Sequence, residues 1–362
     1  DRADPAELAF LQLSGGSTGI PKLIPRTHDD YLYSVRRSNE LCGVTVDTVY
    51  LATLPVAHNF PMSSPGILGA MCAGGTIALT ASPAPSVAWE MVAREGVTMT
   101  GLVPPLARLW TEIAEAGTSF DLSSLDVIQV GGARCPDELA RRIGPALGVR
   151  LQQVFGMAEG LICYTRTDDP RDLVHQVQGA PMSELDEVRV VDEHGRDVPD
   201  GSVGTLLTRG PYTPHGYYRA PEHNARSFVD GWYGSGDVIV RRADGNLVVM
   251  GRDKDIINRG GEKISAEEVE NIAYRLEAVD LAAAVSVPDS VLGERLCMCV
   301  SLMPGAELDL DQLREFMRQQ GIAAFKLPER LEVMDSLPMT KVGKIDKRAL
   351  RESLLDPQHD RA

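Results

Sequence analysis

Short apolar runs alternate with amphipathic helical patterns over the first two-thirds of the chain, and this alternation predicts an α/β fold. Residues 126–133, DVIQVGGA, have the pattern of a buried strand that ends in a glycine turn, and Pro136 suits the first turn of a following helix. Residues 151–156, LQQVFG, form a second strand pattern, which ends at the loop GMAEG. In open α/β sheets, ligands bind beyond the carboxyl ends of parallel strands. We therefore predict a ligand site where these two strands end.

A glycine-rich segment near the N-terminus, SGGSTGIPK at residues 14–22, predicts a site for a polyphosphate. Glycines let backbone N–H groups converge on an anion, hydroxyl groups add donors, and Lys22 adds a positive charge. The spacing is not that of a Walker A loop, and Pro21 stands where a helix would begin. Taken alone, the segment is also compatible with a flexible hairpin turn. The residues predicted to contact the polyphosphate are Ser14, Gly15, Gly16, Ser17, Thr18, Gly19 and Lys22.

Charge and composition restrict the class of partner. The chain has 36 basic and 51 acidic residues, a net charge of −15, which argues against a nucleic-acid-binding surface. Neither a run of transmembrane length nor a signal-peptide pattern is present, so we expect a cytoplasmic protein without a membrane partner. The six cysteines form no CxxC pair, and Cys297 and Cys299 alone are too few for a structural zinc site. We expect free thiols.

The patterning divides the chain into domains. Residues 1–250 read as a large domain with mixed or parallel sheets flanked by helices, and about 185–250 form a β-rich module of hairpin-like strands. A boundary falls at 251–255. Residues 256–356 read as a small α+β domain, in which Ser265 and Glu268 predict a capping box, and 357–362 form a polar tail.

Four further motifs follow the glycine-rich segment: VFGMAEG, YGSGD, GRDKDIINRGGEK and PMTKVGK. In this order and spacing, the five motifs resemble the adenylate-forming superfamily of acyl-CoA synthetases, luciferases and adenylation domains of nonribosomal peptide synthesis. The segments LPVAHNFPMSSPG and QVFGMAEGLICYTRTDDP look most like stand-alone aryl-acid AMP ligases of siderophore biosynthesis. Relative to that family, a substantial N-terminal part of the large domain is missing.

This resemblance implies a reaction in two halves. An aryl carboxylate attacks the α-phosphate of ATP, with Mg²⁺ as the metal cofactor, to give aryl-AMP and pyrophosphate. The phosphopantetheine thiol of an aryl carrier protein then displaces AMP. We expect that carrier protein to act in trans, since the chain ends soon after its last motif.

The resemblance also assigns residues around the nucleotide. Glu159 matches the magnesium ligand, and Lys344 matches the catalytic lysine that bridges the substrate carboxylate and the α-phosphate. Asp237 matches the carboxylate that accepts both ribose hydroxyls, and Arg252 matches a residue that holds ribose or phosphate. Lys254 falls at the hinge. The other expected nucleotide contacts are Gly132, Val154, Phe155, Gly156 and Met157, and the glycines expected to line a pantetheine tunnel are Gly260 and Gly261.

The aryl pocket predicted by the resemblance is an apolar slot with few polar anchors. Asn59 matches the residue that contacts the 2-hydroxyl or carboxylate of the substrate, and Ser64 matches a position that is polar when a 3-hydroxyl must be bonded. Ile162 with Cys163 replaces the Val-Asn pair associated with dihydroxybenzoate enzymes. These cues oppose each other, so we lean to salicylate-type acids but keep 2,3-dihydroxybenzoate as a candidate. The remaining pocket residues are His58, Phe60 and Gly131.

Two other functions stay open at this stage. The same chemistry with coenzyme A as the acceptor would make the protein an aryl- or acyl-CoA ligase. A non-catalytic nucleotide- or aryl-acid-binding protein is the alternative from a different class, motivated by the missing N-terminal part.

Overall fold

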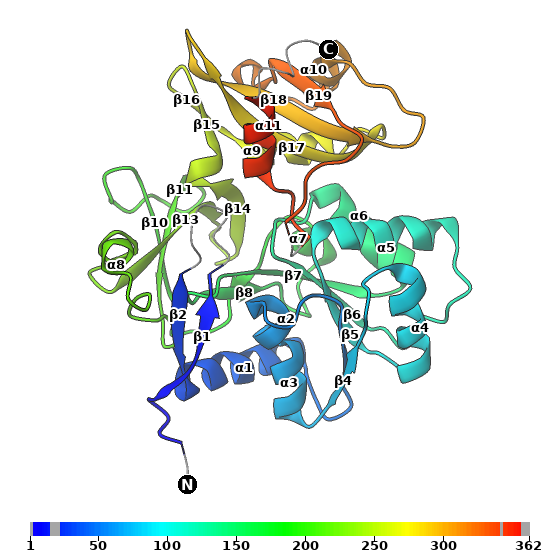
Figure 1. Cartoon of the computed structure of the whole chain (residues 1–362), viewed down its shortest axis with the longest axis vertical. Coiled ribbons are helices and arrows are strands. Elements are labelled where there is room, and N and C mark those ends of the chain that lie inside the picture. The colour runs from blue at the N-terminus through cyan, green and yellow to red at the C-terminus, as the bar shows by residue number, and fades with distance from the viewer. Residues whose placement is uncertain (1–2, 15–21, 341–342, 356–362) are drawn as a thin grey trace. The chain divides into compact units, whose positions relative to one another are not determined.

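The computed structural model describes two compact units (Figure 1). The described residues are 3–14, 22–340 and 343–355. The larger unit comprises Asp1–Ser235 and Ile239–Val249, and the smaller unit comprises Gly236–Val238 and Met250–Ala362. Five of the predicted polyphosphate contacts therefore lie outside the described residues, namely Gly15, Gly16, Ser17, Thr18 and Gly19.

The larger unit is built on a seven-stranded mixed sheet in the order β4–β3–β5–β6–β7–β8–β9. The first five of these strands are parallel, β8 pairs antiparallel with β7, and β9 pairs antiparallel with β8. The prediction of an α/β fold with a mixed or parallel sheet is confirmed. The strands are β3 (Val49–Ala52), β4 (Thr76–Leu79), β5 (Met99–Leu102), β6 (Val127–Gly131), β7 (Arg150–Gly156), β8 (Ile162–Tyr164) and β9 (Ala180–Pro181).

Helices cover both faces of this sheet because successive strand residues point to opposite sides. On one face, Trp89 and Trp110 meet edge-on, with ring centroids 5.8 Å apart, and pack with Ile128. On the other face, Phe60 packs with Val127. The first face is covered by α4 (Pro85–Glu95), α5 (Pro104–Ala116) and α6 (Asp137–Leu147), and the second by α1 (His28–Cys42), α2 (Asn59–Ser63) and α3 (Gly66–Ala73).

Pro136 differs from its predicted place. It is the N-cap residue of α6, with φ −56° and ψ 137°, and it therefore precedes the first helical turn instead of lying in it. The fixed φ of proline suits an extended entry to a helix as well as the first turn.

The predicted β-rich module is also present. A two-stranded hairpin of β1 (Leu8–Leu13) and β2 (Leu23–Thr27) flanks the glycine-rich segment. A separate sheet has the order β10–β11–β13–β12, with β14 paired to β13. Its elements are β10 (Glu187–Val191), β11 (Val203–Arg209), β12 (Phe228–Val229), β13 (Trp232–Arg241) and β14 (Leu247–Arg252), with the short helix α8 (Pro221–Ser227) between β11 and β12. Another short helix, α7 (Arg171–Val174), lies between β8 and β9 of the seven-stranded sheet.

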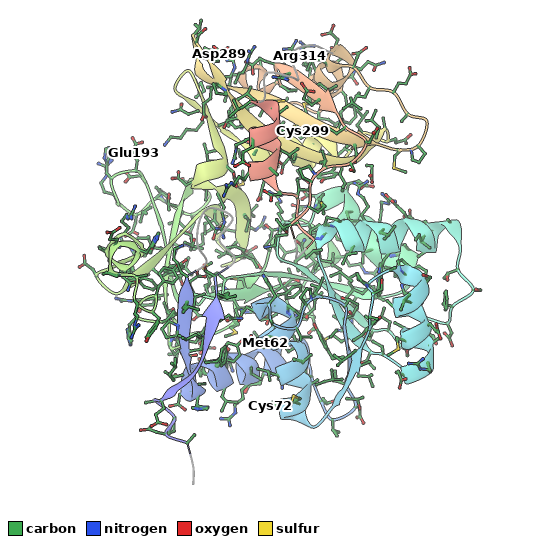
Figure 2. The ribbon with its side chains drawn as sticks, in the orientation of Figure 1. Met62, Cys72, Glu193, Asp289, Cys299 and Arg314 are labelled. Atoms are coloured by element: carbon green, nitrogen blue, oxygen red, sulfur yellow. The ribbon has the colours of Figure 1, made fainter. Side chains whose placement is uncertain are left out.

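The smaller unit is the predicted α+β domain. Its sheet has the order β16–β15–β18–β17, with β19 parallel to β18. Val269 and Leu313 pack with one face of the sheet, and Leu350 packs with Cys297 and Cys299 on the other. Figure 2 labels Cys299 in this unit. The elements are β15 (Ile256–Arg259), β16 (Glu262–Ser265), α9 (Ala266–Ala273), β17 (Val279–Asp289), β18 (Gly293–Leu302), α10 (Leu310–Gln319), β19 (Arg330–Val333), α11 (Lys347–Leu354) and 3-10 turns at Asp253–Asp255 and Ala324–Lys326.

The predicted capping box of α9 is only half formed. The Ser265 hydroxyl accepts a hydrogen bond from the Glu268 N–H at 3.1 Å. The Glu268 carboxylate instead binds the ammonium of Lys326 at 2.6 and 2.7 Å. A distant lysine therefore takes the carboxylate that the local pattern assigns to the helix cap.

The cysteines are free, and Cys72 is exposed while the others are buried. Within the described part of the chain, no helix combines the length and apolar character needed to cross a bilayer.

Candidate functional site

The two ends of the glycine-rich segment are joined by the β1–β2 hairpin. The Ser14 N–H donates to the Lys22 carbonyl oxygen at 2.8 Å, and the Lys22 N–H donates to the Ser14 hydroxyl at 3.0 Å. The ammonium of Lys22 lies 5.0 Å from the ring centroid of Tyr217. Both described ends of the predicted polyphosphate loop are thus held at one place on the larger unit.

Glu159 lies in the tight connection between β7 and β8. The connection is closed by the Met157 N–H, which donates to the Leu161 carbonyl oxygen at 3.1 Å. Glu159 is only 9% exposed, and its Oε1 accepts a hydrogen bond from the Tyr217 hydroxyl at 2.9 Å. The Tyr217 hydroxyl also lies 3.2 Å from the Tyr233 hydroxyl. Because a carboxylate has about four acceptor sites, Glu159 keeps the capacity to bind a cation.

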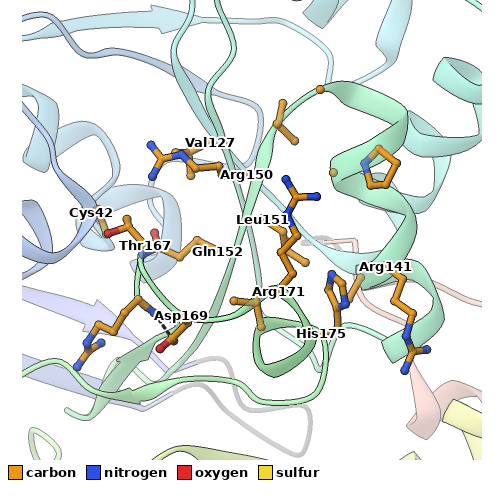
Figure 3. A pocket seen from close by; sticks show the side chains of 17 residues that line it. Cys42, Val127, Arg141, Arg150, Leu151, Gln152, Thr167, Asp169, Arg171 and His175 are labelled. Atoms are coloured by element: carbon orange, nitrogen blue, oxygen red, sulfur yellow. Dashed lines mark hydrogen bonds between the residues drawn. The ribbon is translucent and has the colours of Figure 1, made fainter.

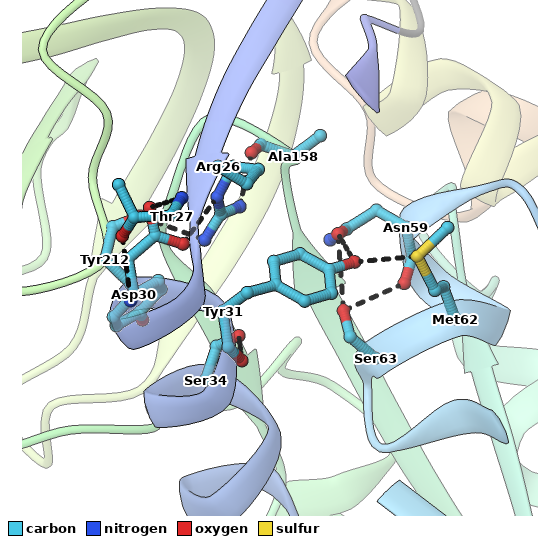
Figure 4. A network of polar contacts seen from close by, with 10 residues as sticks. All are labelled: Arg26, Thr27, Asp30, Tyr31, Ser34, Asn59, Met62, Ser63, Ala158 and Tyr212. Atoms are coloured by element: carbon cyan, nitrogen blue, oxygen red, sulfur yellow. Dashed lines mark hydrogen bonds and ion pairs between the residues drawn. The ribbon is translucent and has the colours of Figure 1, made fainter. Parts of the chain in front are cut away.

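Arg26 fixes this connection to β2, and the sequence reasoning missed it. Its side chain is 2% exposed and donates to the carbonyl oxygen of Ala158 at 2.8 Å, directly beside Glu159 (Figure 4). It also donates to the Tyr212 carbonyl oxygen at 3.2 Å and to Asp30 at 2.9 Å. The strand that follows the glycine-rich segment is therefore bonded to the loop that carries Glu159.

Three glycines, Gly101, Gly131 and Gly132, lie near the carboxyl ends of the parallel strands, and we call them the glycine floor. A Cβ added to Gly131 would lie 3.1 Å from Cζ of Phe60 and 2.9 Å from the carbonyl oxygen of Val154. A Cβ on Gly101 would lie 3.2 Å from the same ring atom. Gly132 follows with φ +82°, a conformation that favours glycine. These contacts bring Phe60, Gly131 and Val154 together, as expected for one wall of an apolar slot.

Asn59 is oriented by two hydroxyl groups. Its Oδ1 accepts from Tyr31 at 3.0 Å and from Ser63 at 3.3 Å (Figure 4). Since both hydroxyls occupy the amide oxygen, the NH₂ group is the end left to donate to a ligand. His58 precedes Asn59 as the N-cap of α2, where its Nδ1 accepts from the Phe60 N–H at 3.4 Å.

Ile162 and Cys163 do not face the same side. Ile162 belongs to the core cluster that contains Phe60, whereas Cys163 belongs to the cluster that contains Met157. This separation follows from the alternation of side chains along β8. The structure supports Ile162 beside the predicted aryl slot but does not support a direct role for Cys163 there. The same alternation along β7 directs Val154 to the first cluster and Phe155 to the second.

Two other predicted residues lie on the Ile162 side. A Cβ on Gly156 would lie 3.3 Å from Cγ1 of Ile162. Ser64 is buried. Burial raises the pKa of Tyr164 well above its usual range, and hydrogen bonds with Ser38 and Ser64 oppose this rise. The Ser64 hydroxyl therefore already has a tyrosine hydroxyl as neighbour.

The smaller unit brings three predicted residues together. Arg252 Nε lies 3.0 Å from Asp237 Oδ1. Burial lowers the pKa of the Lys344 ammonium to about 8, the positive charge of Arg252 adds to this lowering, and Asp237 opposes it. Lys344 is held in a turn in which the Thr340 N–H donates to the Lys344 carbonyl oxygen at 2.7 Å. An ammonium group in this position is still mostly charged at neutral pH.

Gly260 and Gly261 form the two-residue turn between β15 and β16, with φ +57° and +95°. A Cβ on Gly260 would lie 3.1 Å from Cδ2 of Leu292, whereas one on Gly261 would meet nothing within 4 Å. Lys254 lies in the 3-10 turn Asp253–Asp255. The tunnel and hinge roles of these residues remain predictions.

A different hollow lies at the opposite ends of β6 and β7 (Figure 3). This cavity has a volume of about 670 Å³, and its lining includes Val127 and Arg150, the first residues of these strands, together with Arg171 and His175. By contrast, Gly131 of the glycine floor ends β6, and Glu159 follows the carboxyl end of β7. The cavity is therefore separate from the predicted site.

The sequence matches the AMP-binding enzyme family over residues 1–218, and the AMP-binding enzyme C-terminal domain over residues 268–344. The chain belongs to the AMP-binding enzyme family. Two relatives illustrate its place among AMP-binding enzymes. A 2,3-dihydroxybenzoate-AMP ligase of Bacillus subtilis is 56% identical, and the match covers 96% of this chain and 65% of that protein. A salicylyl-CoA synthase / salicylate adenylyltransferase of a Streptomyces species is 55% identical, with 96% and 63% covered.

A solved structure is also similar. The apo structure of MbtA from Mycobacterium smegmatis has a TM-score of 0.67 and 48% identity, covering 97% of this chain and 66% of that chain. The present chain spans less than two thirds of the length of both sequence relatives.

Proposed function

We propose that the protein is an aryl-acid AMP ligase, which forms aryl-AMP and pyrophosphate from ATP and an aryl acid and then transfers the aryl group to a thiol. The observation that carries this proposal is the grouping of Lys344, Arg252 and Asp237 in the smaller unit. The group combines an ammonium, a guanidinium and a carboxylate, which are suitable partners for a substrate carboxylate, a phosphate and a ribose. The names of the two sequence relatives, an aryl-acid AMP ligase and a salicylate adenylyltransferase, support the same reaction.

In this mechanism, Lys344 reduces the repulsion between two anions, the aryl carboxylate and the α-phosphate. A positive charge fixed at that point stabilises the crowded transition state more than the separated reactants. Attack of a carboxylate oxygen forms the new P–O bond, and the bond to pyrophosphate breaks. Asp237 accepts hydrogen bonds from the ribose hydroxyls, and the ends of the glycine-rich segment hold the departing phosphates.

Glu159 fits a magnesium ion. It is a buried carboxylate whose neighbour is a hydroxyl, and Mg²⁺ needs only one or two protein carboxylates besides substrate phosphates. No cluster of three or more metal-binding side chains occurs in the described ranges, which is compatible with such a sparse protein contribution. When bound, the metal neutralises phosphate charge.

The proposed substrate is a planar 2-hydroxybenzoate. Phe60 and the glycine floor at Gly131 supply flat apolar contacts, and the Asn59 NH₂ group supplies a donor for the carboxylate or the 2-hydroxyl. Ile162 narrows the slot, which favours salicylate. Ser64 keeps 2,3-dihydroxybenzoate as the second candidate, since its hydroxyl could exchange Tyr164 for a ring hydroxyl.

The proposed thiol acceptor is the phosphopantetheine arm of an aryl carrier protein acting in trans, in the cytoplasm, within siderophore or nonribosomal peptide synthesis. Coenzyme A is the second candidate, favoured by the name of the salicylyl-CoA synthase relative. The turn at Gly260 and Gly261 offers a narrow backbone surface for either arm.

A pyrophosphate-exchange assay on the full-length protein tests this function, with a panel of substituted benzoates and 3-hydroxypicolinate. We expect exchange that depends on a 2-hydroxybenzoate and a loss of at least about 100-fold in Lys344→Ala, as for other removed transition-state donors. Absence of acid-dependent exchange in both proteins would instead support a non-catalytic binding protein. Thioester formation on coenzyme A, with none on any aryl carrier protein, would replace the proposed acceptor.

A further inference from the structure

Tyr217 lies between the two oppositely charged groups of the larger unit that are assigned to the nucleotide. Its hydroxyl donates to Glu159 at 2.9 Å, and the ammonium of Lys22 lies 5.0 Å from its ring centroid. Lys22 and Glu159, both described in the structure, are not joined by an ion pair. One side chain therefore contacts both charges through different parts of its surface.

The backbone holds Tyr217 firmly in this place. Its N–H donates to Oδ1 of Asn224 at 2.7 Å, and Nδ2 of Asn224 donates back to the Tyr217 carbonyl oxygen at 3.0 Å. The next residue, Tyr218, donates its N–H to the carbonyl oxygen of Leu23, which follows Lys22. The ring of Tyr217 also meets Phe228 edge-on, with centroids 5.4 Å apart.

The proton on the Tyr217 hydroxyl can serve only one bond. Because Tyr217 donates to Glu159, the Tyr233 hydroxyl must donate to the oxygen of Tyr217. The three groups form a directed chain from Tyr233 through Tyr217 to Glu159, and each bond polarises the next. Glu159 Oε1 is thereby held as a hydrogen-bond acceptor.

The arrangement has an electrostatic consequence. A lysine and a buried carboxylate that are free to meet would pair with each other, and each would then be less available to a ligand. Here the carboxylate is satisfied by a neutral hydroxyl, and the ammonium lies at the negative face of the ring. Neither contact cancels the charge of the group that it holds.

We propose that Tyr217 is a positioning residue that keeps Lys22 and Glu159 apart, so that the ammonium stays available to phosphate and the carboxylate to the metal ion. The proposal rests on the proposed function for the identity of these ligands. It assigns separate tasks to two parts of one side chain: the hydroxyl orients Glu159, and the ring face holds Lys22.

Two substitutions separate these tasks in the full-length protein. Tyr217→Phe keeps the ring but removes the hydroxyl, and Tyr217→Leu removes both. Tyr233→Phe is the matched control, because it removes a hydroxyl from the same cluster while the bond from Tyr217 to Glu159 remains. The readout is Mn²⁺ binding, followed by electron paramagnetic resonance with a non-hydrolysable ATP analogue present, together with binding of that analogue without metal.

We expect Tyr217→Phe to weaken Mn²⁺ binding by about 10-fold, in the range found for residues that orient metal ligands, with little change in metal-free analogue binding. Tyr217→Leu should weaken both, and Tyr233→Phe should change Mn²⁺ binding less than Tyr217→Phe does. Equal Mn²⁺ affinity in wild type and Tyr217→Phe would overturn the proposal, as would loss of both affinities in Tyr217→Phe with normal folding. Because these readouts need no turnover, they stay separate from the exchange assay that tests the function itself.

Discussion

The ring of Phe60 lies directly on the backbone of Gly131, since a Cβ added there would come within 3.1 Å of Cζ of the ring. The same Cβ would meet the Val154 carbonyl oxygen at 2.9 Å, and that atom belongs to the strand backbone and cannot yield. The absence of a side chain at this position therefore sets how close Phe60 comes to the end of β6.

Gly131→Ala tests this contact. We expect it to raise the KM for the aryl acid severalfold, because the ring must tilt into the slot, and to destabilise the protein by about 1–3 kcal/mol through overpacking. The KM for ATP should change little. Gly144→Ala is the control, because its Cβ would meet only the Val149 carbonyl oxygen at 3.2 Å on a helix remote from Phe60. An unchanged KM for the acid would show that the ring does not bound the slot.

Removal of the Arg26 side chain should lower the free energy of unfolding of the larger unit more than removal of most other side chains. Arg26→Met leaves Asp30 and the carbonyl oxygens of Ala158 and Tyr212 without their donor, and breaking a buried pair costs about 3–5 kcal/mol. Arg37→Met, which breaks a more exposed pair with Glu40, should cost less than about 1 kcal/mol. Urea unfolding of both variants gives the comparison, and similar losses would contradict the assigned importance of the buried network.

The rate of adenylation should fall as pH rises through about 8, since Lys344 acts as an ammonium and its pKa is lowered to about 8. Arg252→Gln removes a neighbouring positive charge and should move this alkaline limb to higher pH. Asp237→Asn should move it to lower pH. The position of the limb, not the height of the profile, is the measurement, because both residues are also assigned to the nucleotide. A limb that stays in place in both variants would separate Lys344 from these charges.

The same pKa has a consequence for stability. Between pH 8 and the usual lysine value of 10.5, the unfolded chain binds more protons at Lys344 than the folded chain does. The contribution of this group to the free energy of unfolding therefore rises with pH in that window. Comparing the pH dependence of unfolding for wild type and Lys344→Met checks the sign, and a contribution that falls with pH would refute the lowered pKa.

Ser64→Ala should impair the use of 2,3-dihydroxybenzoate more than that of salicylate. A site that bonds a substrate hydroxyl discriminates strongly against losing that bond, whereas an unused hydroxyl does not. The ratio of kcat/KM values for the two acids is the measurement. Tyr164→Phe serves as the partner variant, because it removes the protein hydroxyl that neighbours Ser64. Unchanged selectivity in Ser64→Ala would remove this residue from the substrate pocket.

The sequence was sufficient where a local pattern sets the geometry. The strand ends near Gly131 and Gly156 follow from apolar runs that stop at glycines, and the parallel order explains why their loops meet at one edge. The helix of the smaller unit that begins after Ser265 follows from its cap. Ile162 and Cys163 were predicted as a pair in the aryl pocket, but neighbours in a strand point to opposite faces, and these two side chains belong to different core clusters.

Contacts between distant segments could not be read from one sequence. Arg26 and Ala158 are separated by 132 positions, and Tyr217 and Glu159 by 58. From the sequence alone, an arginine in a strand, such as Arg26, is predicted to face solvent. A tyrosine near a turn, such as Tyr217, is predicted to pack in the core. The capping bond predicted for the Glu268 carboxylate does not form for the same reason, because this carboxylate binds Lys326, which comes close to it only in the folded unit.

The buried network of Arg26 also bears on how the protein is made. The arginine leaves the ribosome long before Ala158 and Tyr212, whose carbonyl oxygens complete its shell. Until those segments arrive, its guanidinium gains more from water than from the nascent core. The β1–β2 hairpin therefore cannot complete its buried contacts early in synthesis. Folding of the larger unit must wait until the segment that contains Tyr212 has been made.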